Sequence, residues 1–189
     1  MLILRGDAKG SRVAIARRPR AGPRQERSRR DRAGTRCAVR RHQSEPLVGA
    51  VRHHFARPGN RFWRVLHEAG FTNRLLAPNE GRELLKRKLG ITNLVNRATA
   101  SADELDTVHF RAGARRIAAK VRRYRPKVVA FVGIGAYRAA FGRARARVGR
   151  QEEALGGATI WVLPNPSGRT AGYQMPALSR AFRGLRRSL

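Results

Sequence analysis

Apolar positions in the second half of the chain follow two periods that alternate along the sequence. Apolar residues three and four positions apart, among them Phe110 and Val121, predict a long amphipathic helix that ends before Pro126. Continuous apolar runs at residues 128–132 and 159–163 predict strands that are buried on both faces of a sheet. Because helices and buried strands alternate, the pattern predicts an α/β fold with a mainly parallel central sheet.

Shorter patterns predict the remaining elements. The further helices are expected at 61–69, 78–88, 136–141 and 176–185, and a further strand at 91–95. Asn60 is positioned to cap the first of these helices and Gly70 to end it. Ser101, with Glu104 three residues later, fits a capping box at the start of the long helix.

A proline-rich loop at residues 164–173 separates the last apolar strand from the last helix. Prolines flank Asn165, so the backbone must leave the sheet along a stiff path, and the loop then carries the cation Arg169. Parallel sheets place their sites at the carboxyl ends of strands, which makes this loop a candidate for contact with a phosphodiester backbone. From spacing alone, a surface turn after a core strand is the simpler interpretation.

Residues 1–46 differ from the rest of the chain. They hold fourteen Lys or Arg residues against four acidic ones, no aromatic residue, and neither helical nor strand periodicity. Such a composition is typical of a disordered basic arm that adds non-specific affinity for nucleic acid. We therefore expect residues 1–46 to lack regular packed structure and residues 47–189 to form the folded domain.

The whole chain of 189 residues has 42 Lys and Arg against 12 Asp and Glu, a formal net charge of +30. This excess indicates a polyanionic partner, although a GC-rich genome also produces an abundance of Arg, Ala and Gly. Cys37 is the only cysteine, which excludes a disulfide framework and a cysteine-ligated zinc or iron–sulfur site within the chain. Since the sequence shows no transmembrane run and no signal peptide, we expect no membrane contact and a cytoplasmic, nucleoid-associated location.

Three other features have a structural explanation beside a functional one. Gly133 and Gly135 follow a strand, but no acidic residue lies where a dinucleotide site requires it, so a tight strand-to-helix turn is favoured. His53 and His54 have no third ligand at suitable spacing, so no metal site is predicted. Phe55, in a polar loop, is either a core residue or a platform for a flat ligand such as a base.

Four segments together resemble one family. They are HHFARPGNRFW at 53–63, AGFT at 69–72, GITNLV at 90–95 and LPNPSG at 163–168. In this order and at this spacing they resemble the mismatch-specific uracil/thymine DNA glycosylase family, within the uracil-DNA glycosylase superfamily. Each segment alone is a weak signal, but the set is specific, and the resemblance covers about residues 47–189.

The resemblance implies a single three-layer α/β/α sandwich that hydrolyses the N-glycosidic bond of uracil, or thymine, opposite guanine. Such an enzyme flips the nucleotide out of double-stranded DNA, because the target atoms are inaccessible within the base stack. The implied partner is therefore duplex DNA with G·U or G·T mismatches, and the implied state is a monomer. The resemblance implies no metal and no organic cofactor.

The resemblance also implies roles for particular residues. Phe55 would stack on the flipped base, and Asn165 would lie at the floor of the base pocket. The implied DNA-contacting residues are Pro166, Ser167, Gly168 and Arg169. Of these, residues 167–169 would form the wedge that enters the duplex and fills the vacated space. Arg169 departs from family members whose wedge tip is apolar.

One motif of the family is absent from this chain. In the family the first core strand ends in Gly-Ile-Asn-Pro and a small residue, and the Asn positions the attacking water. Here the corresponding residues 41–45 read RHQSE, with Gln43 at the Asn position. We therefore predict that no catalytic residue is intact, that the first strand of the sheet is missing or disordered, and that catalysis is impaired.

A shifted reading frame would account for this difference. With the frame moved by one base, codon degeneracy allows residues 31–45 to read Ile-Ala-Pro-Gly-Leu-Asp-Val-Leu-Phe-Val-Gly-Ile-Asn-Pro-Ser, which is an apolar strand followed by the missing motif. The hypothesis is that the amino-terminal segment is out of frame, and it would also explain the composition of residues 1–46. A regular, buried strand at about residues 36–42 would contradict it.

Two alternatives belong to other classes. In the first, the chain is a non-catalytic DNA-binding protein, Gln43 is a genuine replacement, and residues 1–46 are a basic arm whose deletion lowers the salt dependence of DNA binding. In the second, which is weaker, the chain is a nucleotide-binding α/β domain that uses the turn at Gly133.

Overall fold

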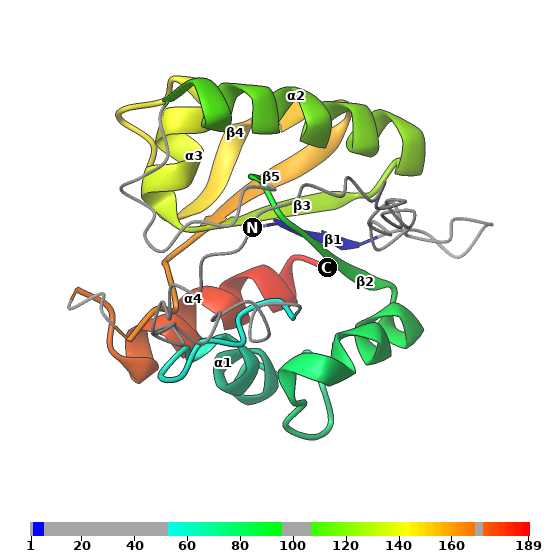
Figure 1. Ribbon diagram of the computed structural model, residues 1–189, viewed down its shortest axis with the longest axis vertical. Coiled ribbons are helices and arrows are strands. Elements are labelled where there is room, and N and C mark those ends of the chain that lie inside the picture. Colours follow the sequence, from blue (N-terminus) through cyan, green and yellow to red (C-terminus); the bar gives the residue numbers. More distant parts are fainter. Residues whose placement is uncertain (1, 6–52, 96–106, 169–171) are drawn as a thin grey trace, which may run out of the picture.

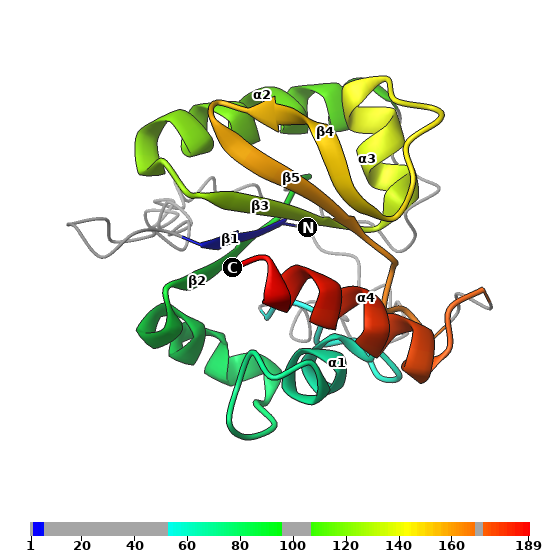
Figure 2. The same ribbon diagram turned by 180° about the vertical axis from the view of Figure 1, so that it is seen from behind.

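The computed structural model describes residues 2–5, 53–95, 107–168 and 172–189. Its elements in chain order are β1 (Leu2–Arg5), α1 (Phe62–Glu68), the 3-10 helix η1 (Pro78–Arg87), β2 (Leu89–Thr92), α2 (Thr107–Tyr124), β3 (Val128–Val132), α3 (Ile134–Phe141), β4 (Gly149–Leu155), β5 (Ala158–Leu163) and α4 (Met175–Arg187). The sheet lies between two groups of helices, with α2 and α3 on one side and α1, η1 and α4 on the other (Figures 1 and 2).

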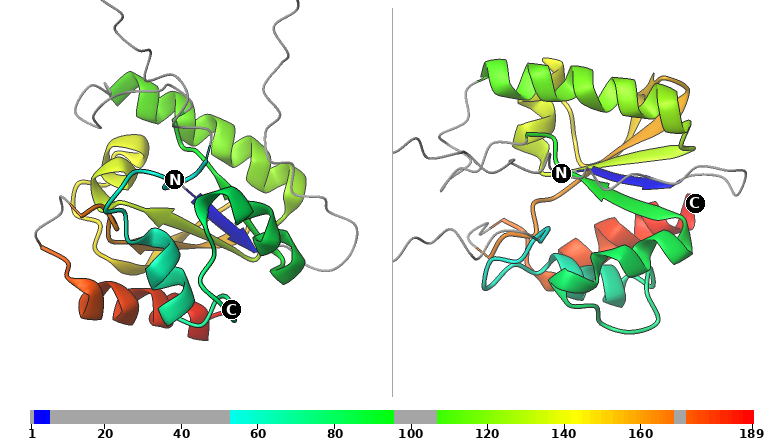
Figure 3. Two further views of the ribbon diagram at one scale, coloured as in Figure 1. Left: turned by 60° about the horizontal axis from the view of Figure 1, so that its bottom comes forward. Right: turned by 45° about the vertical axis from the view of Figure 1, so that its right-hand side comes forward.

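The central sheet is buried on both faces, as the continuous apolar strands predict. In β3, Val128, Ala130 and Val132 belong to the hydrophobic cluster that includes α1, η1 and α4. Val129 and Phe131 belong to the second cluster, with α2 and α3. This assignment follows the period of two of a strand, and all five side chains are at most 7% exposed. The three-layer α/β/α sandwich is confirmed (Figure 3).

The strand order in the sheet is β2-β1-β3-β5-β4. β3 and β5 are parallel, whereas β1 is antiparallel to both β2 and β3, and β4 is antiparallel to β5. β2, β3 and β5 therefore run in one direction, and β1 and β4 run in the other. The α/β class is confirmed, but the sheet is mixed rather than mainly parallel.

β4 is a strand for which the sequence shows no pattern. Its side chains alternate between half-buried and exposed, but the sequence GRQEEAL contains too few apolar residues to reveal this alternation. A turn at Gly156 and Gly157, with φ angles of 55° and 85°, joins β4 to β5. A short hairpin turn of this kind requires an antiparallel pair, which explains one of the two reversed strands.

β1 is the second reversed strand, and it comes from the start of the chain. Its four residues pair with β2 on one side and with β3 on the other. The prediction that residues 1–46 lack regular structure is therefore wrong for residues 2–5, because this apolar stretch supplies main-chain partners to two strands that would otherwise have unpaired edges. Residues 36–42, on which the shifted-frame hypothesis depends, lie outside the described residues.

The boundaries of the other elements follow local chemistry. The N-cap of α1 is Arg61 rather than the predicted Asn60, because Arg61 O accepts the first hydrogen bond of the helix, from Val65 N–H at 2.8 Å. Asn60 lies one residue earlier, and its Oδ1 accepts a hydrogen bond from the main-chain N–H of Phe62 at 3.0 Å. Gly70, at φ 80°, follows the end of that helix. The segment after Pro78 is a 3-10 helix, and β2 begins and ends earlier than the predicted strand at 91–95. The proposed capping box at Ser101 lies outside the described residues.

Candidate functional site

The candidate site lies at the edge of the sheet where β2, β3 and β5 have their carboxyl ends. Val132 at the end of β3 is opposite Leu163 at the end of β5, and Leu2 at the beginning of β1 is opposite Thr92 at the end of β2. The loop that follows β5, residues 164–168, therefore starts at the edge that sequence reasoning identified. In Figure 1 it is the orange segment that leaves β5 towards α4.

Two prolines shape the start of this loop. Pro164 and Pro166 are buried, whereas Asn165 between them is exposed. Asn165 Oδ1 accepts a hydrogen bond from the main-chain N–H of Ser167 at 3.1 Å, which closes a local turn. The loop is thus held rigidly by its own residues, with the amide of Asn165 at its surface.

A second segment, residues 53–61, packs against this loop. The main-chain N–H of Arg61 donates to Pro166 O at 3.0 Å, and its guanidinium donates from Nε to Pro166 O at 3.3 Å and from Nη2 to Ser167 O at 2.9 Å. A Cβ atom added to Gly168 would lie 2.8 Å from Gly59 O, so the two backbones are in close contact. Sequence reasoning assigned no role to Arg61, and its place within the segment at 53–63 was the one available signal.

Phe55 in the same segment is stacked on a second aromatic ring. Its ring is stacked on Phe62 with a centroid distance of 3.7 Å and an interplanar angle of 18°, and Phe62 is fully buried. Phe55 itself is half-buried and has a φ angle of 57°, which is uncommon for a residue other than glycine. The two interpretations of Phe55 are thus compatible, because one face of the ring packs on the core while part of the side chain remains accessible.

His54 joins the segment to the end of β2. Its Nδ1 lies 3.1 Å from Asn93 Oδ1, and its main-chain carbonyl accepts a hydrogen bond from Trp63 Nε1 at 3.0 Å. Burial lowers the pKa of His54, an effect that the hydrogen bond with Asn93 partly opposes. A neutral imidazole that donates from Nδ1 fits this environment, so His54 serves to anchor the segment.

The long helix α2 holds the segment after β2 in place. Lys120 Nζ donates to Thr92 Oγ1 at 2.5 Å, and Arg116 Nη2 donates to Leu94 O at 3.3 Å. Gly113 permits this approach, because a Cβ atom at that position would lie 2.2 Å from Leu94 O. The site edge is therefore supported from both faces of the sheet.

The turn after β3 has the form that its sequence favours. Gly133, at φ 108°, forms a tight turn that leads directly from β3 into α3, as favoured over a dinucleotide site. Among the residues that the structure describes, no group of three or more His, Cys, Asp or Glu side chains is arranged to hold a metal ion. None of the helices in this described part is long and apolar enough to cross a membrane. Gln43 and Arg169 lie outside the described residues.

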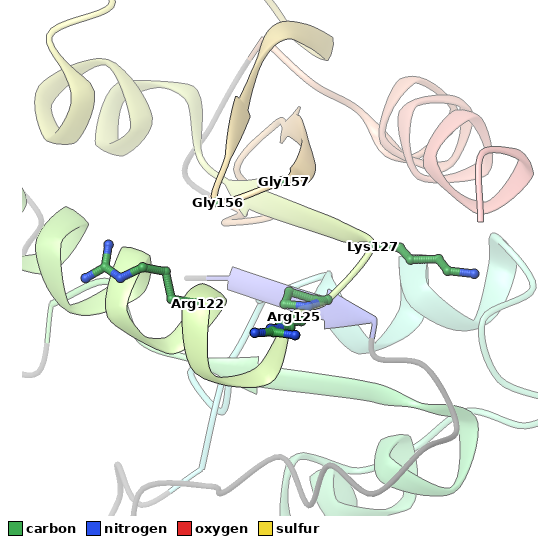
Figure 4. Close-up of a pocket in the computed structure, with 6 residues that line it drawn as sticks. Arg122, Arg125, Lys127, Gly156 and Gly157 are labelled. Atoms are coloured by element: carbon green, nitrogen blue, oxygen red, sulfur yellow. The ribbon is translucent and has the colours of Figure 1, made fainter.

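Two surface clefts lie away from this edge. The first is at the opposite edge of the sheet, between the end of α2 and the turn from β4 to β5, and is lined by Arg122, Arg125, Pro126, Lys127, Gly156 and Gly157. In Figure 4 the side chains of Arg122 and Lys127 point in opposite directions, and cations at the end of a helix are stabilised by its dipole. The second cleft lies beside η1 and includes Thr72 and Arg87. Neither cleft includes Phe55 or Asn165.

The fold and the site define a class of protein. It is an α/β/α sandwich whose sheet edge carries a stiff proline-rich loop, clamped to a segment with a core-supported aromatic ring. A family model for the uracil DNA glycosylase superfamily matches residues 42–186, and the chain belongs to this superfamily. Its members are DNA glycosylases, which hydrolyse N-glycosyl bonds. The match begins after β1, so the first strand of the sheet lies outside the family domain.

Proposed function

We propose that this protein is a glycosylase of the mismatch-specific type, which recognises uracil or thymine opposite guanine in double-stranded DNA. The observation that carries the proposal is the contact between residues 53–61 and 164–168. These two segments contain the sequence motifs that resemble the mismatch-specific family, and Arg61 joins them at the carboxyl edge of the sheet.

The proposed roles follow from the position of each group. A flipped base is flat, and Phe55 offers a ring that is already backed by Phe62. Pro166, Ser167, Gly168 and Arg169 form the proposed DNA-contacting loop. Of these, residues 167–169 are the proposed wedge, which occupies the space that the base leaves. In the reaction, water attacks the sugar C1′ as the bond to the base breaks, and the base leaves as an anion that is then protonated.

We further propose that catalysis is impaired in this chain, because Gln43 replaces the Asn that positions the water. The direction of β1 supports this proposal. A strand that delivers a catalytic loop to the site edge must have its carboxyl end there, parallel to β2 and β3. β1 occupies the place between these strands but runs in the opposite direction, and its carboxyl-terminal Arg5 is opposite Leu89 and Val128, at the far edge.

The shifted reading frame remains our explanation for the missing motif. β2 and β3 run in the same direction, with their carboxyl ends at the site edge. A strand placed between them and parallel to both would therefore carry a terminal Gly-Ile-Asn-Pro motif to that edge. The nucleotide sequence through the codons of residues 31–45 tests the explanation directly. Codons that do not permit Ile-Asn-Pro in the shifted frame would refute it.

The function is tested by a glycosylase assay on a duplex with a single G·U pair. We expect little or no excision by the chain as written and efficient excision by a version in which the frame of residues 31–45 is corrected. Efficient excision by the chain as written would contradict the proposed impairment. Binding of DNA by both versions without excision would instead favour the non-catalytic DNA-binding protein.

A further inference from the structure

Arg61 is the residue through which the two segments of the site are connected. Three of its donors make this connection, namely its main-chain N–H, its Nε and its Nη2. The acceptors are the main-chain carbonyls of Pro166 and Ser167, which lie more than one hundred positions later in the chain. A planar guanidinium with donors in fixed directions is suited to holding two successive carbonyls at once.

The two acceptor carbonyls lie at the base of the proposed wedge. Pro166 and Ser167 lie immediately before and within the proposed wedge, so Arg61 holds the base of the wedge loop. The close approach of Gly168 to Gly59 O, at 2.8 Å for an added Cβ, extends the same contact by one more residue. Because its main chain accepts these bonds, the loop can change its side chains without losing its position.

Arg61 is also coupled to the proposed base platform. It directly precedes Phe62, whose ring supports Phe55, and Asn60 on its other side accepts the hydrogen bond from Phe62 N–H. The platform and the anchor of the wedge therefore belong to one short segment at the start of α1. Any displacement of Arg61 changes the distance between the place for the flipped base and the loop that fills the gap.

We propose that Arg61 is a positioning residue that sets the wedge loop at a defined distance from the Phe55 platform, so that base flipping and gap filling occur together. This inference rests on the proposed function. It assigns to Arg61 no contact with the base, the sugar or the phosphates, since its Nε and Nη2 donate to the protein's own carbonyls.

A fluorescent duplex distinguishes this role from a phosphate contact. The probe is a duplex with 2′-fluoro-2′-deoxyuridine opposite guanine, which resists hydrolysis, and with 2-aminopurine as the neighbouring base. Fluorescence of 2-aminopurine rises when its stacking is disturbed by flipping and by wedge entry. The full-length chain is compared with the variants Arg61→Ala and Arg61→Lys. Arg64→Ala is the matched control, because Arg64 is three positions away, exposed, and paired with Glu68 at 2.8 Å.

We expect both Arg61 variants to lose the fluorescence rise by about fivefold or more at saturating protein, because hydrogen bonds from charged donors contribute more than neutral ones. Lys keeps the charge but not the planar fork, so it should not rescue the signal. The slope of log affinity against log salt should stay that of the wild type in both variants, since no phosphate contact is lost. Thermal unfolding confirms that each variant is folded, and Arg64→Ala should retain the full signal.

Two results would overturn the inference. One is a wild-type signal from Arg61→Lys, and the other is a salt slope lowered by about 0.9 in Arg61→Ala, the value for one phosphate contact. Failure of the proposed function is a different outcome. In that case the wild-type chain itself gives no fluorescence rise on the uracil duplex above that on a fully paired duplex.

Discussion

At the scale of single residues, Phe55 and Asn165 of the candidate site have surroundings that their neighbours in the sequence do not predict. Phe55 is held at a positive φ angle of 57° by its packing on Phe62. A backbone in this region costs free energy, which the surrounding contacts must supply. Asn165, expected at the floor of a pocket, is exposed on its loop.

Replacement of Phe55 by Ala tests the proposed platform. Stacking of a base on an aromatic ring contributes about 1–3 kcal/mol, so affinity for the duplex with 2′-fluoro-2′-deoxyuridine should fall about 5- to 150-fold. Affinity for a fully paired duplex should change little, because no base is flipped there. Both affinities are measured by fluorescence anisotropy at one salt concentration. Equal losses on the two duplexes would mean that Phe55 acts only as a core residue.

Tyr137, which lies outside the candidate site, makes the stability of the fold depend on pH. Burial, together with its hydrogen bond to Glu153 at 3.1 Å, raises the pKa of Tyr137 from 10.0 to about 12. The folded state thus retains a proton that the unfolded state loses, so this stabilising contribution is complete below pH 10 and is lost as the pH rises towards 12. The stability difference between the wild type and Tyr137→Phe should shrink across this range in urea unfolding. A difference that is constant with pH would contradict the assignment.

At the scale of elements, the close approach of α2 to the main chain of Leu94 helps to position the site edge. α2 contacts the end of β2 through Lys120 and the residues after β2 through Gly113 and Arg116. Asn93 in the same stretch anchors His54. The helix is therefore part of the framework of the site, although it contributes no proposed DNA contact.

Gly113→Ala tests this framework. The added methyl group would lie 2.2 Å from Leu94 O, so the helix must shift, and the free energy of unfolding should fall by about 1–3 kcal/mol. Gly135→Ala in α3 is the matched control, since no atom lies within 4 Å of its added Cβ. Its stability should be unchanged or raised by up to about 1 kcal/mol, because Ala favours a helix over Gly. Equal effects of both changes in urea unfolding would disprove the close contact.

At the scale of the whole molecule, the formal net charge of +30 favours sequence-independent affinity for DNA. The position at which DNA binds is therefore a sharper test of the proposed site than the affinity itself. Arg57 is exposed in the segment at 53–61, and Arg122 and Arg125 line the cleft at the opposite edge. Charge alone therefore does not indicate where a duplex would lie, and the proposed site rests instead on the contact between the two loops.

Hydrogen exchange measured by mass spectrometry locates the duplex. On binding the duplex with 2′-fluoro-2′-deoxyuridine, residues 53–61 and 164–168 should exchange more slowly, because DNA covers them. Residues 122–127 and 156–157 should change little. Protection confined to the latter ranges would place the DNA at the opposite edge and contradict the proposed site.

Much of the architecture was predictable because it depends on local patterns. The apolar run of β3 and the period of α2 each reflect burial of the element's own side chains, and both were correctly located. β1 and β4 were missed for a different reason. A four-residue strand and a polar edge strand are stabilised by their neighbours' main chains, which leave no periodic signal in their own sequence.

For the candidate site, local patterns in the sequence were sufficient to locate the proline-rich loop and the aromatic candidate Phe55, while the superfamily was indicated by the resemblance of four motifs. Contacts between distant segments decided the direction of β1, the support of Phe55 by Phe62, and the clamp from Arg61 to Pro166 and Ser167. The physical reason is that side-chain burial follows the period of each element, whereas every residue type has a main-chain carbonyl that can accept a hydrogen bond. Its partner can therefore be identified only after the chain has folded.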